Sequence, residues 1–211
     1  MDNAPAYPEV PAPGGQVRVA LVFAHPCPES FGAHLRDTAC DILAANGHDV
    51  DLIDLYAERF DPVLGADEWV NRRAGGPDWP EPADHARRLA EANGLLLVHP
   101  TWWGGPPAIL KGWFDRVLSP RVAYPLAASG ASRPGNLRHV RRLSVVTTHG
   151  SSRLVNGLQG EPGRWTVMRA LRTSLHPLAR TRWLGCYGMD RNSDEERSRF
   201  VDRVRQHLDG W

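Results

Sequence analysis

Three short segments of the chain place polar, aromatic and small residues directly after an apolar run. They span residues 25–32, 100–105 and 147–150. The middle segment contains Trp102 and Trp103, two large flat side chains with no obvious core to fill at the end of a strand. In the first segment Ser30 stands just before a predicted helix, and the free N–H groups at a helix start bind phosphate well. These residue types indicate a site for a ligand with a flat ring and an anionic group.

The strands and helices expected around these three segments predict that the segments lie close together in the fold. Apolar runs predict buried strands over 17–24, 50–55, 95–98, 143–148 and 183–187. Helical patterns separate them over 31–46, 83–92, 106–117 and 163–174, and a closing helix covers 194–208. This alternation predicts an α/β fold, a parallel sheet with helices on both faces. Five such strands favour the flavodoxin-like order 2-1-3-4-5, in which ligands bind at the carboxyl ends of the strands.

Each signal also has a structural explanation. Ser30 is a good N-cap for the helix that follows, and caps are far commoner than phosphate ligands. His25 could be an ordinary polar loop residue, the two tryptophans could pack against a neighbouring loop or subunit, and Thr147 and Thr148 could simply end a strand. Their coincidence at one predicted rim favours the ligand site over these separate explanations.

Composition excludes several classes of partner and site. The chain has 25 Lys and Arg against 24 Asp and Glu, so neither nucleic acid nor a membrane surface is indicated as a partner. Cys27, Cys40 and Cys186 are isolated, which implies no disulfide framework and no zinc site and favours a reducing, cytoplasmic location. The histidines are scattered without metal-ligand spacing, so no metal is expected. No apolar run is long enough for membrane insertion, and no signal peptide is expected.

The chain divides into an arm and one domain. Residues 1–16 are rich in Pro, Ala and Gly and are predicted to be a flexible arm, while 17–211 form a single domain. Long irregular connections are expected over 56–82 and 119–134. No G-x-G-x-x-G follows the first strand, which argues against a classical dinucleotide-binding Rossmann domain. No G-x-x-x-x-G-K-[ST] is present, which argues against a nucleoside triphosphate-binding loop.

Four blocks of the sequence resemble a known family. They read HPCPESFGAHLRDTA, DVDLIDLYAERFDPVL, HPTWWGGPPAILKGWFDRVLSPRVAY and SVVTTHG, and the resemblance runs from about residue 17 to the end. They are similar to the NAD(P)H:quinone oxidoreductases of the flavodoxin-like fold, the group that includes mammalian DT-diaphorase. The resemblance implies a homodimeric flavoprotein that passes hydride from NAD(P)H through FAD to a quinone or similar flat aromatic acceptor, with each site closed by the partner subunit.

The resemblance also implies roles for individual residues. His25, Ser30, Phe31 and Gly32 would hold the phosphates and ribityl chain of the flavin, and Gly32 stands where the family often has Asn. Two further segments would contact the flavin ring, namely Pro100, Thr101, Trp102, Trp103 and Gly104 on one edge, and Thr147, Thr148, His149 and Gly150 on the other.

The end of the chain bears on the identity of the flavin. Met189 and Arg197 match positions that contact the adenosine half of FAD, which favours FAD while FMN stays possible. Arg197 could equally be a solvated helix residue. Tyr124 falls in a segment that reaches over the partner's flavin and packs on substrate.

One departure from the family concerns proton transfer. The family's tyrosine and histidine beside the flavin follow the segment that matches 147–150, but residues 151–162 here contain neither type. His149 or Asn156 could substitute as a hydrogen-bond donor to the reduced flavin, and a histidine has a pKa suited to that role. The candidate catalytic residues are therefore His149, Asn156 and Tyr124, with a turn residue as the competing explanation for His149.

Two further functions stay open at this level. One is a tailoring reductase of an aromatic natural product, or an azo or nitro reductase. The other is a flavin-binding electron carrier or a regulatory subunit of a transporter. The near-neutral charge and the His25-Pro26-Cys27-Pro28 segment after the first strand disfavour a carrier, which is usually acidic and has a Thr/Ser-rich phosphate loop there.

Overall fold

The structure, a computed structural model, describes residues 15–74, 79–119, 122–123 and 136–211. Its centre is one parallel sheet in the order β2-β1-β3-β4-β5. The strands are β1 (Arg18–Phe23), β2 (Asp49–Asp54), β3 (Gly94–Thr101), β4 (Arg142–His149) and β5 (Arg180–Tyr187). The predicted α/β class and strand order are confirmed.

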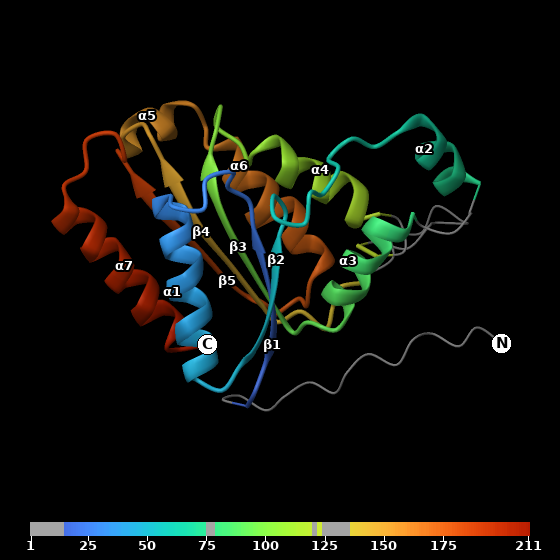
Figure 1. Ribbon diagram of the computed structural model, residues 1–211, viewed down its shortest axis with the longest axis horizontal. Coiled ribbons are helices and arrows are strands. Elements are labelled where there is room, and N and C mark those ends of the chain that lie inside the picture. The colour runs from blue at the N-terminus through green and yellow to red at the C-terminus, as the bar shows by residue number, and fades with distance from the viewer. Residues whose placement is uncertain (1–14, 75–78, 120–121, 124–135) are drawn as a thin grey trace.

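Helices cover both faces of the sheet, because alternate side chains of each strand point to opposite sides. Val19, Leu21 and Phe23 of β1 pack with α1 (Phe31–Ala45) and α7 (Asp194–Leu208) in one apolar core. Ala20 and Val22 belong to a second core. It includes α3 (Pro80–Ala90), α4 (Ala108–Val117) and the segment 162–174. Figure 1 shows α1 and α7 side by side on one side of the sheet, with α3 and α4 on the other.

Two helices were not predicted, because neither has an apolar buried face. In α2 (Ala66–Arg73) the buried residues are Glu68 and Arg72, which pair with each other. In α5 (Arg153–Leu158) the buried residue is Asn156, whereas Leu154 and Leu158 are exposed. The apolar period that reveals a helix in a sequence is therefore absent from both.

The predicted helix over 163–174 is divided into three short pieces. They are α6 (Pro162–Trp165), the π-helical segment η1 (Thr166–Ala170) and the 3₁₀ segment η2 (Leu171–Ser174). Val167 and Leu171 still reach the core, which explains why the apolar spacing resembled that of one continuous helix.

Strand β3 is longer than the predicted 95–98 and carries Pro100 and Thr101 beyond that range. A proline in a central strand lacks the N–H that the ladder would use. Here β1 pairs with β3 only as far as Phe23 and Val98, so Pro100 has no β1 residue opposite it. Consequently the last residues of β3 extend past the neighbouring strand, beside the carboxyl end of β4.

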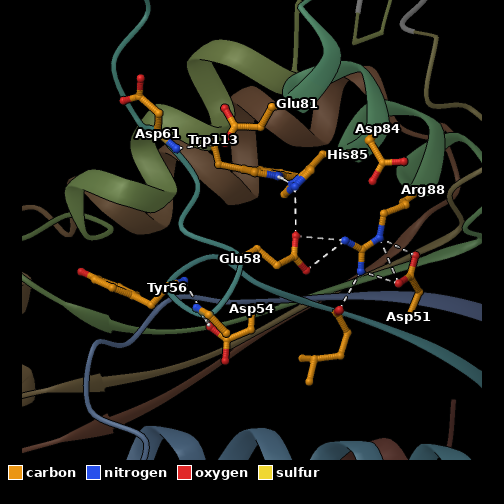
Figure 2. A network of polar contacts seen from close by, with 12 residues as sticks. Asp51, Asp54, Tyr56, Glu58, Asp61, Glu81, Asp84, His85, Arg88 and Trp113 are labelled. Carbon is orange, nitrogen blue, oxygen red and sulfur yellow. Dashed lines mark hydrogen bonds and ion pairs between the residues drawn. The ribbon is translucent and has the colours of Figure 1, made fainter.

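A chain of polar contacts joins the end of β2 to helices α3 and α4 (Figure 2). Trp113 of α4 donates to His85 Nδ1 over 2.9 Å, and His85 Nε2 lies 3.0 Å from a carboxylate oxygen of Glu58. Glu58 and Asp51 both bind Arg88, with closest distances of 3.0 and 2.6 Å. These contacts connect α4, the helix that follows residues 100–105, through α3 to the edge strand β2.

Three predicted features fall outside the described residues, namely residues 1–14 of the arm, most of the irregular connection over 119–134, and Tyr124. Within the described part of the chain, none of the helices combines the length and apolar character that a membrane span requires.

Candidate functional site

A cavity of about 1020 Å³ lies at the carboxyl ends of β1, β3 and β4. All three segments identified in the sequence contribute to this cavity. Residues 25–32, 100–105 and 147–150 therefore converge at one site, as predicted. The predicted residues that line it are His25, Ser30, Phe31, Gly32, Pro100, Thr101, Trp102, Trp103, Gly104, Thr148, His149, Gly150, Asn156 and Met189.

Two predicted contact residues lie outside this lining. The Thr147 side chain is fully buried, and its hydroxyl lies 3.0 Å from that of Thr101. Thr147 therefore supports the wall instead of forming it. Arg197 donates to the carbonyl oxygen of Met189 over 3.5 Å, so it touches the edge of the site through the backbone of a lining residue.

The first segment offers hydrogen-bond donors to an anion. Ser30 is the N-cap of α1 and its Oγ accepts the N–H of Ala33 over 3.1 Å, which leaves its hydroxyl proton free to donate. His25 Nδ1 lies 3.0 Å from the N–H of Cys27 and 3.2 Å from its carbonyl oxygen; because the backbone N–H can only donate, Nδ1 accepts and the ring proton belongs on Nε2. The cap explanation for Ser30 and the ligand explanation are thus compatible in one geometry.

The middle segment is a tight turn that presents an indole to solvent. Trp102 and Gly105 exchange backbone hydrogen bonds of 2.9 and 3.0 Å. Between them Trp103 and Gly104 have φ values of 52° and 75°, and the left-handed conformation is unusual for a tryptophan. Trp103 is fully exposed at 105%, and Trp102 is 43% exposed. A costly backbone conformation that exposes a large apolar ring is typical of a binding site.

His149 lines the cavity from the end of β4, where it is paired with Thr101 in the β3–β4 register. Its Nδ1 lies 2.9 Å from Oδ1 of Asn156, and its ring stacks on Tyr187 with centroids 4.3 Å apart. Burial lowers the pKa of His149, against the smaller raising effects of Asn156 and Glu161. Burial also lowers the pKa of His99, deeper in β3, to about 4.

Sequence reasoning missed several residues of the site. Ser151, Gln159, Pro162 and Asp190 also line the cavity. Tyr187 lies behind His149, from β5, although residues 151–162 contain no tyrosine. The parallel register pairs His149 with Tyr187, so the ends of the predicted fourth and fifth strands could have indicated this contact.

Comparison with known proteins identifies the family of the chain. A family model described as a flavodoxin-like fold matches residues 17–208. Ribosyldihydronicotinamide dehydrogenase (quinone) of Pongo abelii is 31% identical over 165 residues, which is 68% of this chain and 69% of that protein. The chain belongs to the flavodoxin-like NAD(P)H:quinone oxidoreductase family.

Other members of the family are more distant in sequence or differ in length. NAD(P)H dehydrogenase (quinone) 1 of Cavia porcellus is 28% identical over 162 residues, covering 68% of this chain. The present family member spans 58% of the length of that relative. The crystal structure of Smu.1420 from Streptococcus mutans UA159 superposes with a TM-score of 0.80 at 28% identity, covering 92% of this chain and all of the other.

Proposed function

We propose that the protein is a flavin-dependent NAD(P)H oxidoreductase that transfers hydride from NAD(P)H, through bound FAD, to a quinone or a similar flat aromatic acceptor. One observation carries the proposal: three strand ends meet in a single cavity of about 1020 Å³ that holds a helix N-terminus on one side and two exposed indoles on another. That size and mixture of apolar and polar lining suit a cofactor with a ring and a phosphate.

The lining residues fit a flavin on chemical grounds. The hydroxyl of Ser30, the Nε2–H of His25 and the N–H groups at the start of α1 are donors suited to phosphate. Trp102 and Trp103 offer flat apolar surface for the ring. When bound, a flavin supplies the hydride chemistry, whereas the protein supplies position and electrostatics.

His149 and Asn156 are the candidate residues for handling the proton. Asn156 donates its Nδ2 hydrogens to the carbonyl oxygens of Ser151 and Ser152 over 3.1 and 2.9 Å. Its Oδ1 therefore faces His149 Nδ1 as an acceptor, and the imidazole proton belongs on Nδ1. The lone pair of His149 is then on Nε2, a buried atom that forms no hydrogen bond with the described residues.

The choice of FAD over FMN rests on the end of the site nearest the start of α7. Met189 lines the cavity and Arg197 holds its carbonyl oxygen, so both predicted adenosine contacts are at the same edge. We propose FAD as the resident flavin, with FMN as the alternative that a binding measurement distinguishes.

A homodimer with sites at the interface is part of the proposal. Elements that line the cavity expose large apolar side chains, including Trp103 of the turn and Leu154 and Leu158 of α5, at 105%, 74% and 81%. Such side chains gathered beside a cavity are typical of a surface that a partner covers. Tyr124 of a partner remains the residue expected to reach over the flavin and pack on substrate, and the cytoplasmic location remains a prediction from the isolated cysteines.

Absorbance spectroscopy tests the proposal most directly. The purified protein, incubated with excess FAD or FMN and then desalted, should retain a yellow flavin spectrum, and stopped-flow mixing with NADH or NADPH should bleach it. A panel of quinone, azo and nitro compounds then identifies the acceptor. Protein that stays colourless after incubation with both flavins contradicts the proposal, and retained flavin that no pyridine nucleotide reduces favours an electron carrier.

Single tryptophan variants test which part of the cavity holds the ring. Trp103→Ala should lower flavin affinity roughly three- to tenfold, the factor that an aromatic stacking contact contributes. Trp69→Ala is the matched control, because Trp69 is also exposed, at 51%, but belongs to α2 and is absent from the lining. Equal affinities of the two variants would place the ring elsewhere.

A further inference from the structure

His149 lies flat against Tyr187 at the carboxyl end of the sheet. The ring centroids are 4.3 Å apart and the planes differ by 13°. The two residues are paired in the β4–β5 register. Gly185 allows the arrangement, since a Cβ there would lie 2.7 Å from Tyr187 Cε2. The tyrosine ring therefore folds back over the glycine and forms a rigid backing for the imidazole.

The hydroxyl group of Tyr187 is fixed from the opposite side. It donates to Oε1 of Glu161 over 2.6 Å, and the other carboxylate oxygen of Glu161 binds Arg164 over 2.9 Å. Glu161 has a left-handed φ of 44°, a conformation that a residue with this side chain seldom adopts without support. Its two hydrogen-bonded partners provide that support.

The same turn is attached to the indole-bearing segment. The N–H of Gly163 donates to the carbonyl oxygen of Gly104 over 2.9 Å, and Pro162 lines the cavity. A Cβ at Gly163 would lie 3.0 Å from that oxygen, so the two chains approach closely. The Tyr187–Glu161 bond thus connects the wall behind His149 to the turn that carries Trp103.

We infer that Tyr187 and Glu161 are positioning residues for His149: together with Asn156 they clamp the imidazole in one orientation and one tautomer, with the proton on Nδ1. The inference rests on the proposed function in one respect, namely that His149 faces a flavin. Neither positioning residue lines the cavity, so both act through His149 and the wall.

Hydrogen bonding within the clamp supports this assignment. Asn156 contacts one edge of the imidazole and Tyr187 its face, and Nε2 of His149 is buried without a hydrogen-bond partner among the described residues. Native structures rarely leave a buried nitrogen unpaired, and such groups often have a functional role. In the described part of the chain, the charged or titratable groups beside His149 are Tyr187, Glu161 and, from β3, His99.

Nuclear magnetic resonance of the flavin-free protein tests the clamp without requiring activity. Long-range ¹H–¹⁵N spectra report the tautomer of His149, assigned by its loss in His149→Gln, and a pH series reports its pKa. Tyr187→Ala should raise that pKa toward the ordinary value, because burial is what lowers it. Glu161→Gln should lower it further, because the carboxylate raises it. Tyr56→Phe, a half-buried tyrosine outside the cavity, is the control.

Tyr187→Phe keeps the stacked ring and removes only the hydroxyl group, so it guards against a folding defect in the alanine variant. It should increase exchange of the Gly163 amide hydrogen and, in the flavin-loaded protein, slow reduction by NAD(P)H roughly tenfold, about what one hydrogen bond to a charged group is worth. Affinity for oxidised flavin should change less than the reduction rate. The pH profile of reduction should shift with the pKa of His149.

Opposite outcomes separate the two proposals. An unchanged tautomer and pKa of His149 in all three variants, each folded by circular dichroism, overturns the positioning role whatever the flavin result. Failure of the wild-type protein to bind flavin overturns the proposed function, while shifts of His149 in the flavin-free variants would still establish the clamp.

Discussion

The indole Nε1–H of Trp113 donates to Nδ1 of His85 over 2.9 Å (Figure 2). Nδ1 is therefore an acceptor, and the ring proton belongs on Nε2, which lies 3.0 Å from Glu58. A second proton on Nδ1 would face the indole N–H directly. Burial lowers the pKa of His85, and the neighbouring guanidinium of Arg88 adds to the effect while Glu58 opposes it.

This arrangement predicts that the protein loses stability as the pH falls from 7.5 to 5.5. The pKa of His85 is lower in the folded than in the unfolded chain, so below about pH 6.5 the unfolded chain binds more protons and the free energy of unfolding decreases. His99, whose pKa burial lowers to about 4, acts in the same direction and contributes a loss of about 1 kcal/mol over this range. Urea denaturation at several pH values measures the slope.

His85→Gln separates the contribution of His85 from the others. Glutamine offers Trp113 an acceptor and Glu58 a donor, but it does not titrate, so the variant should show a shallower pH dependence than the wild type. His85→Ala leaves the indole N–H without its acceptor and should cost about 1–3 kcal/mol at pH 7.5. An identical pH slope in wild type and His85→Gln would show that His85 is not a source of the effect.

Glu68 is predicted to be the most sensitive charged residue outside the cavity. Its carboxylate binds both Arg72 and Arg116, with 2.9 Å to the Nε of Arg116, and all three side chains are less than a tenth exposed. Removing one member of a buried ion network leaves uncompensated charge, so Glu68→Gln should lower the free energy of unfolding by about 3 kcal/mol.

An exposed ion pair provides the comparison for Glu68. Lys111 and Asp115 lie 2.6 Å apart with side chains 53% and 48% exposed. Asp115→Asn should change stability by about 0.5 kcal/mol or less. Chemical denaturation of both variants tests the difference, and equal small losses would contradict the buried network.

Gly112 is predicted to tolerate no side chain, although alanine is the better helix former. A Cβ at this position of α4 would overlap the backbone of Pro62, which cannot move as a flexible side chain does. Gly112→Ala should therefore destabilise the protein by about 2–3 kcal/mol. Gly157→Ala in α5 has open space around its Cβ and should gain up to about 1 kcal/mol. Thermal denaturation of both variants measures these changes. Stabilisation by both substitutions would contradict the close approach of Gly112 to the backbone of Pro62.

Ser30 and Ser193 give a matched pair for the anion end of the cavity. Each caps a helix, Ser30 accepting the N–H of Ala33 and Ser193 that of Glu196, so alanine at either position should cost about 1 kcal/mol of stability. Only Ser30 lines the cavity, so only Ser30→Ala should also weaken FAD binding. Titration of the flavin-free variants with FAD measures these affinities. Equal FAD affinities of Ser30→Ala and Ser193→Ala would show that Ser30 acts only as a helix cap.

The layers of the fold and the end of the sheet that carries the site could be predicted from the order of residue types along the chain. Apolar runs such as Leu95–Val98 predict buried strands, and their alternation with helices permits few topologies. The strand order then predicts that the segments after β1, β3 and β4 meet, because the carboxyl ends of parallel strands lie at one edge of the sheet. The sequence contains this information because burial of one face of each strand and helix imposes a regular spacing of apolar residues along the chain.

Which side chains face the cavity and which support it became evident only from the three-dimensional arrangement. Thr147 turned out to be buried beneath the lining, and Tyr187, absent from the local stretch, stands behind His149 from another strand. The helices α2 and α5 could not be predicted because their buried faces are polar. Glu68 binds Arg116, which is distant in sequence, and Asn156 binds His149 across a short turn. Such partnerships depend on distances between segments in space, which no local pattern of residue types records.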